Sequence, residues 1–148
     1  MIALACDHGA YALKETVKVW LLERGYSVED FGTYCAESVD YSDFGAAAAR
    51  AVAKGQCERG IVLCTSGIGM SIAANKICGI RCALCTDTLM AELTRKHNDA
   101  NMLALGAGIS GEFLSLRIVE AFLTTAFEGG RHQRRVDKIS ALEEVPIG

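Results

Sequence analysis

Short apolar runs alternate along the chain with longer segments in which apolar residues recur at helical spacing. The short runs predict five strands, at residues 2–6, 26–31, 61–64, 80–85 and 102–105. The longer segments predict helices at residues 10–24 and 41–54, at the end of 61–76, around 89–97, after 111 and at 137–145. The helix after residue 111 carries Leu114, Ile118 and Phe122, with Phe127 as a candidate last member. Apolar runs without alternation are typical of strands that are buried on both faces.

Strands alternate with helices throughout, which favours a parallel α/β sheet with right-handed crossovers. We predict an α/β fold: a single doubly wound Rossmann-like (flavodoxin-like) domain over residues 1–148, with a five-stranded parallel sheet in the order 2-1-3-4-5. Such sheets bind ligands beyond the carboxyl ends of the strands, where the strand order reverses. Here that place lies between the first and third strands, so the turns at 7–9 and 64–67 are expected to meet.

Composition narrows the class of protein. The chain has 148 residues, 51% of them apolar and 22% charged, which is typical of one globular domain. The net charge of −3 gives no argument for a nucleic-acid or anionic-membrane partner. No apolar run approaches the ~18 residues of a spanning helix, and the N-terminus lacks the basic start of a signal peptide. Seven irregularly spaced cysteines argue against a disulfide framework, so we infer a reducing, cytoplasmic location.

The turn CTSGIGMS, residues 64–71, is the most distinctive local motif. It lacks the ending of a phosphate-binding P-loop and is too short a match for a dinucleotide fingerprint. It is either a plain tight turn between strand and helix or a nest of N–H groups, from Gly67 to Ser71, that holds an oxyanion or a phosphate. Cys64 at its base is either a buried, inert cysteine or a reactive one, because a helix N-terminus favours the thiolate.

Further candidates lie at the ends of other elements. Asp7 and His8 follow the first strand, where Asp7 is either a helix N-cap or, with His8, part of the pocket. His97 closes a predicted helix, where a cationic cap is the simpler interpretation. Arg131 and Arg135 lie in the one dense basic cluster, which is either a solvated face or a phosphate grip if a helical turn aligns them.

Cys82 and Cys85 have the spacing of half a zinc knuckle, but no second pair follows. Because they fall inside a predicted strand, core packing is the favoured interpretation.

Together the motifs identify a family. The chain resembles the type B ribose-5-phosphate isomerases, a group that includes the galactose-6-phosphate isomerase subunits. The resemblance covers nearly the whole chain and runs, in order, through ACDHGAYALKE, ESVDYSDFG, GIVLCTSGIGMSIAANK, GIRCAL, RKHNDANMLALG and EGGRHQRRV. It implies a doubly wound fold, dimers or dimers of dimers with active sites between subunits, and aldose–ketose isomerisation of a sugar phosphate without a metal or other cofactor.

The resemblance also implies roles for individual residues. Cys64 matches the catalytic base, which moves a proton between C1 and C2 through an enediolate, and Ser66 stands at the position of a threonine near the reacting oxygens. His97 matches the histidine that opens the furanose ring, reaching in from the partner subunit. The implied substrate contacts are Asp7, His8, Gly67, Gly69, Ser71 and Asn98, and the implied phosphate contacts are Arg131, His132 and Arg135. One branch of the family has a glutamate base where this chain has Met70, which cannot abstract a proton, so the resemblance places the chain in the cysteine branch.

Two departures from the family pattern bear on the substrate. Thr65 replaces a glycine in the turn, so the turn must accept a Cβ there. Gly108 stands where the family often has an arginine, which removes one cation near the phosphate.

We therefore expect a cytoplasmic, cofactor-free isomerase that converts ribose 5-phosphate to ribulose 5-phosphate. A 6-phosphohexose isomerase is the alternative within the class, and a non-catalytic sugar-phosphate sensor is the alternative outside it.

Overall fold

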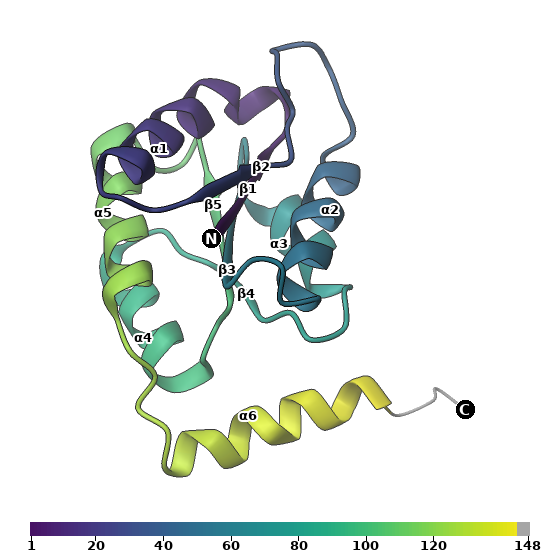
Figure 1. Ribbon diagram of the computed structural model, residues 1–148, viewed down its shortest axis with the longest axis vertical. Helices are drawn as coiled ribbons and strands as arrows, with labels where there is room; N and C mark the ends of the chain where they lie inside the picture. Colours follow the sequence, from purple (N-terminus) through teal and green to yellow (C-terminus); the bar gives the residue numbers. More distant parts are fainter. Residues whose placement is uncertain (145–148) are drawn as a thin grey trace.

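Five parallel strands form one sheet that has helices on both faces, in a computed structural model that describes residues 1–144 (Figure 1). The strands are β1 (Ile2–Cys6), β2 (Val28–Asp30), β3 (Arg59–Cys64), β4 (Cys82–Leu84) and β5 (Met102–Gly106). The helices are α1 (Tyr11–Glu23), α2 (Tyr41–Ala53), α3 (Ile68–Asn75), α4 (Thr88–Asn98), α5 (Glu112–Thr124) and α6 (Arg131–Ala141), with short 3-10 turns η1 (His8–Ala10) and η2 (Leu142–Glu144). The predicted fold class is confirmed.

The strand order across the sheet is β2-β1-β3-β5-β4, so the predicted order 2-1-3-4-5 is wrong for its last two strands. The reason is burial. Every residue of β5 is buried, whereas every residue of β4 is half-buried. A strand with a neighbour on each side loses more surface to its neighbours, so the wholly apolar Met102–Leu105 run takes the inner position and β4 takes the edge.

The exposed edge of β4 is covered by a side chain. The amide of Asn75 donates to the carbonyl of Cys82 and accepts the Cys82 N–H, each at 2.8 Å. A free strand edge is a template for pairing with another chain, and Asn75 occupies this one.

The core is divided by the sheet into two clusters. Leu4, Leu63 and Leu105 point to the face covered by α1, α4 and α5. Ala5, Val62 and Ala104 point to the other face, where the packing residues of α2 and α3 are mostly alanines. Small side chains let α2 and α3 approach the sheet closely, which fixes α3 just beyond the end of β3.

The loop between β2 and α2 is held by a buried ion pair. Lys14 is fully buried and donates to both carboxylate oxygens of Asp30, each at 2.9 Å, and to the carbonyl of Thr33 at 2.7 Å. Burial alone would raise the pKa of Asp30, but hydrogen bonds from Lys18, Lys14 and the Gly32 N–H outweigh it and leave this pKa below its usual value. The pair therefore anchors the chain at the carboxyl edge of the sheet.

Two helix boundaries differ from the prediction. α5 ends at Thr124, so Phe127 lies outside it, and the last helix begins at Arg131 rather than 137 and ends at Ala141. Gly129 and Gly130, which lie directly before α6, have φ values of 64° and 55°. These left-handed conformations separate α5 from α6. Residue 145 of the predicted tail helix lies outside the described residues. Between residues 1 and 144, no helix is long and apolar enough to cross a membrane.

Candidate active site

The turns that follow β1 and β3 meet at the carboxyl edge of the sheet, as predicted. The N–H of Asp7 donates to the carbonyl of Leu63 at 3.1 Å. A cleft of about 400 Å³, which we call the thiol cleft, opens here and is lined by Asp7, Tyr41, Cys64, Thr65, Ser66, Ile68, Gly69 and Ile72. The strand order reverses between β1 and β3, so the cleft lies at the topological switch point.

Cys64 lies at the base of this cleft. It is the last residue of β3 and is 5% exposed. Its Sγ accepts a hydrogen bond from the N–H of Gly67 at 3.1 Å, just before α3 begins. The positive end of that N–H dipole, and of the helix behind it, thus points at the sulfur, where negative charge develops when the thiol loses its proton.

The turn after β3 needs glycine at two positions, because neighbouring atoms leave no room for a side chain there. Gly67 has φ 77°, and a Cβ there would lie 2.5 Å from Leu84 Cδ1. A Cβ on Gly69 would lie 2.7 Å from the ring of Tyr41, which forms a wall of the cleft. The tight-turn interpretation is therefore correct, and it is compatible with a nest of N–H groups.

The two serines of the turn have local partners. Ser66 Oγ accepts the N–H of Ile68 at 3.2 Å, and Ser71 Oγ donates to the carbonyl of Ile68 at 2.8 Å. Ser66 lines the thiol cleft, whereas Ser71 is not one of the described residues that line it. Of the two hydroxyls, that of Ser66 is the one placed beside Cys64.

Asp7 and His8 have different surroundings. Asp7 caps η1 by accepting the Gly9 N–H at 3.0 Å, which confirms the N-cap, and it also lines the thiol cleft. His8 is exposed and is not part of the described cleft lining, and its Nδ1 accepts the N–H of Val39 at 3.2 Å. With Nδ1 occupied as an acceptor, the neutral ring carries its proton on Nε2.

Thr65 and Gly108, the two positions that differ from the family pattern, are in contact. The N–H of Gly108 donates to the carbonyl of Thr65 at 2.8 Å. A Cβ on Gly108 would lie 3.1 Å from that carbonyl oxygen and 3.2 Å from Thr65 Cγ2, and a Cβ on Gly9 would collide with Thr65 Oγ1. Thr65 is accepted because two neighbouring glycines leave room for its side chain.

The remaining predicted residues gather elsewhere, in what we call the basic half-site: His97, Asn98, Arg131, His132 and Arg135. The rings of His97 and His132 stack with centroids 4.4 Å apart and an interplanar angle of 15°. Arg131 and Arg135 both belong to α6, one helical turn apart, as their spacing predicted. Both are exposed, and within the described residues neither takes part in an ion pair. The two guanidiniums are available to an anion from outside.

Glu128 also belongs to this region. It begins the EGGRHQRRV stretch of the resemblance, but it was not among the candidate residues and lies in the segment between α5 and α6. Its carboxylate is 3.4 Å from Nε2 of His132, whose side chain is only 7% exposed. Burial, followed by the positive charges of its neighbours, lowers the pKa of His132 from its usual value.

One chain does not bring the two groups of residues together. Cys64 pairs with Gly106 at the carboxyl ends of β3 and β5, whereas α4 ends just before β5 begins at Met102. The paired strands alone separate these ends by about 13 Å, because a parallel strand rises about 3.3 Å per residue. α6 lies across the end of the domain where α4 ends, away from η1 (Figure 1). His97 and Cys64 therefore face different ends of the same molecule.

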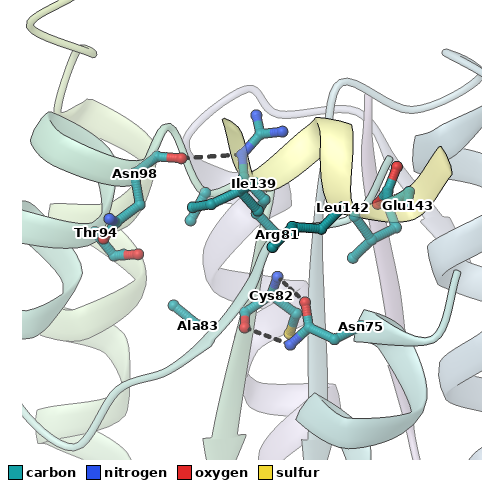
Figure 2. A pocket seen from close by; sticks show the side chains of 11 residues that line it. Asn75, Arg81, Cys82, Ala83, Thr94, Asn98, Ile139, Leu142 and Glu143 are labelled. Carbon is teal, nitrogen blue, oxygen red and sulfur yellow. Dashed lines mark hydrogen bonds between the residues drawn. The ribbon is translucent and has the colours of Figure 1, made fainter. Parts of the chain in front are cut away.

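A second cavity, of about 420 Å³, lies between β4, α4 and the end of α6 (Figure 2). Two of its polar side chains have partners: Arg81 Nε donates to the carbonyl of Asn98 at 2.9 Å, and Glu143 accepts the N–H of Gly79. Ile139 and Leu142 in its wall remain 44% and 71% exposed. Among the described residues that line it, the one thiol is that of Cys82, which belongs to β4.

Cys82 and Cys85 belong to the sheet edge and the core, as favoured from the sequence. Cys82 is half-buried in β4 and Cys85 is buried. Burial raises the pKa of Cys82 to about 12 and that of Cys85 to about 11. Met70 is fully buried beside α2, so no ionisable side chain occupies its position.

The fold and the thiol cleft define an α/β protein with a thiol at its switch point and two exposed arginines on the helix at its other end. The chain belongs to the Ribose/Galactose Isomerase family, whose model matches residues 2–139. It is 46% identical over 143 residues to ribose-5-phosphate isomerase B of Escherichia coli K12, covering 97% of this chain and 96% of the relative.

Solved structures of ribose-5-phosphate isomerases B have the same fold as this chain. Ribose-5-phosphate isomerase B of Clostridium thermocellum is 53% identical, with a TM-score of 0.96 and 97% of each chain covered. Ribose-5-phosphate isomerase B of Mycoplasma genitalium, solved with bound ribulose-5-phosphate, is 37% identical, with a TM-score of 0.94 over 98% of this chain and 97% of the other.

Proposed function

We propose that this chain, as one domain over residues 1–148, is an isomerase that interconverts ribose 5-phosphate and ribulose 5-phosphate without a metal or other cofactor. The observation that carries the proposal is Cys64, a thiol held by the Gly67 N–H at the base of a cleft at the switch point of the sheet. Relatives at 46% and 53% identity are named ribose-5-phosphate isomerase B, and a third was solved with the ketose product bound.

In the proposed mechanism Cys64 acts as the base. Its thiolate removes the proton from C2 of the open-chain aldose, and the electron pair of that C–H bond forms the C1–C2 double bond of an enediolate. The C1 carbonyl oxygen takes the negative charge, beside Ser66 and the N–H groups of the turn. Cys64 then returns the proton to C1, while the O2 proton passes to O1 and O2 becomes the ketose carbonyl.

The proposal requires a second copy of the chain. His97 is assigned to ring opening, and Arg131, His132 and Arg135 to the phosphate, yet all of them lie at the far end of the molecule from Cys64. A homodimer, or a dimer of dimers, would join the thiol cleft of one subunit to the basic half-site of its partner. Ile68 and Ile72 are 53% and 56% exposed in the wall of the cleft, which favours an apolar contact there. The four buried cysteines take part in no disulfide, which favours the cytoplasm as the compartment; they are Cys6, Cys57, Cys64 and Cys85.

One observation favours a second candidate substrate. Gly108 leaves no cation beside Thr65, where the family resemblance implies an arginine. A longer sugar, such as a hexose 6-phosphate, would place its phosphate differently and need no charge at that point.

The first test is Cys64→Ala. We expect kcat for ribose 5-phosphate to fall at least ~100-fold, because a positioned acid–base group contributes about that much or more. Substrate binding, measured by calorimetry, should persist. Cys57→Ala is the matched control, because Cys57 is buried in the same core cluster but is not part of the described lining of the cleft.

Near-normal turnover by Cys64→Ala would remove Cys64 from the mechanism. A wild-type protein that binds sugar phosphates without any turnover, across a panel of aldose and ketose phosphates, would instead identify a sensor.

A further inference from the structure

Three side chains of metal-ligand type converge beside the basic half-site. His97, Glu128 and His132 each offer one donor atom, and these atoms all lie within 4.8 Å of one another. They come from α4, from the segment before α6 and from α6 itself. The tertiary fold, rather than one local motif, brings them together.

We propose that His97, Glu128 and His132 bind a divalent transition-metal ion such as Zn²⁺, and that the bound ion inhibits the enzyme. Two imidazoles and one carboxylate are a ligand set that zinc accepts in sites that keep a fourth position open. Neutral imidazole is the form that binds a metal.

Binding one ion requires the cluster to rearrange, because the His97 and His132 rings stack with an interplanar angle of 15° and one ring must rotate before both in-plane lone pairs can point at the same ion. Zinc bonds of about 2.0–2.2 Å place tetrahedral donors roughly 3.4 Å apart, and the Glu128 carboxylate already lies 3.4 Å from His132 Nε2. The Glu128 side chain is 50% exposed, so it can move toward an ion without disturbing the core.

The positive charges of two nearby arginines limit the affinity of the proposed site for a metal ion. Arg131 and Arg135 both act electrostatically on His132, and their positive charges oppose a dication. They also favour an anion as the fourth ligand. We therefore expect a reversible site that fills when free metal is available, rather than a permanently loaded one.

The inhibitory consequence rests on the proposed function. A metal bound to His97 occupies the ring nitrogen that the proposed ring opening needs, and it lies where the sugar phosphate would bind. Metal binding itself does not depend on that assignment and can be measured without substrate.

The test is a titration of the purified protein with ZnCl₂, followed by the imidazole nitrogen signals in NMR. The chain has three histidines, so His8 serves as an internal reference. We expect the signals of His97 and His132 to shift while those of His8 do not. Glu128→Gln should weaken this binding at least ~tenfold, a loss typical of weakened zinc sites. Glu120→Gln is the control and should bind as the wild type does, because Glu120 is a half-buried glutamate of α5 that pairs with Arg117.

Activity gives the second readout, because zinc also binds thiols. Inhibition of isomerisation by ZnCl₂ should be reversed by chelator, compete with sugar phosphate and require at least ~tenfold more zinc in Glu128→Gln. Unshifted His97 and His132 signals, or equal zinc affinity in Glu128→Gln and wild type, would overturn the site. If the signals shift but zinc does not inhibit, the metal site stands and its inhibitory role is overturned. If the wild-type protein has no isomerase activity, the proposed function is contradicted, but the metal site is not.

Discussion

At the scale of single residues, the two groups that the proposed reaction uses differ in how they are held. Cys64 is fixed by the end of a buried strand and by one N–H, so its sulfur has little freedom. Arg131 and Arg135 extend from an exposed helix face, and no ion pair among the described residues holds either of them. In the proposed reaction the base would therefore be preorganised, whereas the phosphate contacts would form only with substrate.

The phosphate grip can be tested one arginine at a time. A charged hydrogen bond contributes about 1.5–3 kcal/mol, so Arg131→Ala and Arg135→Ala should each raise KM for ribose 5-phosphate roughly ten- to a hundredfold. Arg134→Ala removes the same charge from the same exposed helix and should change KM little. Steady-state kinetics on the three variants measures this. Equal effects from all three would indicate a general charge effect rather than specific contacts.

His97 is expected to act on ring opening rather than on the C2 proton. Ribose 5-phosphate is largely cyclic, whereas an aldotetrose 4-phosphate has no free hydroxyl to close a furanose ring. His97→Asn should therefore reduce kcat/KM at least ~tenfold more for the pentose than for the tetrose phosphate, within the range of acid–base contributions. Kinetics with both aldoses decides the matter, and equal losses would remove this role from His97.

At the scale of elements, the ends of the strands could be predicted from the sequence and their order could not. Apolar runs such as 2–6 and 61–64 stop where polar and glycine residues begin, so the turns that carry Asp7 and Cys64 were located correctly. β5 rather than β4 lies next to β3, and this order depends on how deeply each strand is buried. In the sequence, only Arg81, directly before β4, indicates that β4 is the edge strand. The start of α6 was missed because its first turn is polar, with His132 as its buried side chain.

The loops after β3 and β5 are also coupled, through Thr65 and Gly108. Gly108→Arg in the wild-type background adds a Cβ against Thr65, so it should disturb the turn that holds Cys64 and lower kcat. In a Thr65→Gly background the methyl contact is gone, and the added arginine should lower KM for ribose 5-phosphate by restoring a cation near its phosphate.

The measurement is a double-mutant cycle on kcat/KM, with pentose and hexose phosphates as substrates. We expect a coupling of about 0.5–3 kcal/mol, as for residues in contact. Additive effects would show that the two departures are independent. A rise in KM for the hexose phosphate, from a side chain that crowds the longer sugar, would favour the hexose as the natural substrate.

At the scale of the whole molecule, one chain carries the two parts of the proposed site, the thiol cleft and the basic half-site, at opposite ends. Periodicity and motifs placed His97 at the end of α4 and Cys64 at the end of β3, both correctly. No pattern within one chain could bring them together, because the sheet holds them at opposite ends. Only the family resemblance supplied the idea of a site between subunits, and the described chain is compatible with it.

Subunit complementation tests that idea directly. Cys64→Ala damages only the thiol cleft and Arg135→Ala only the basic half-site, so in a dimer with shared sites each variant alone has two defective sites. Dissociating a 1:1 mixture and letting it reassociate should give mixed dimers in which one site combines both lesions and the other is intact. Random pairing makes half of the dimers mixed, so about a quarter of wild-type site activity should return on reassociation, measured with substrate well below the raised KM of Arg135→Ala. Sites contained within one subunit would regain nothing, because every subunit in the mixture carries a lesion of its own.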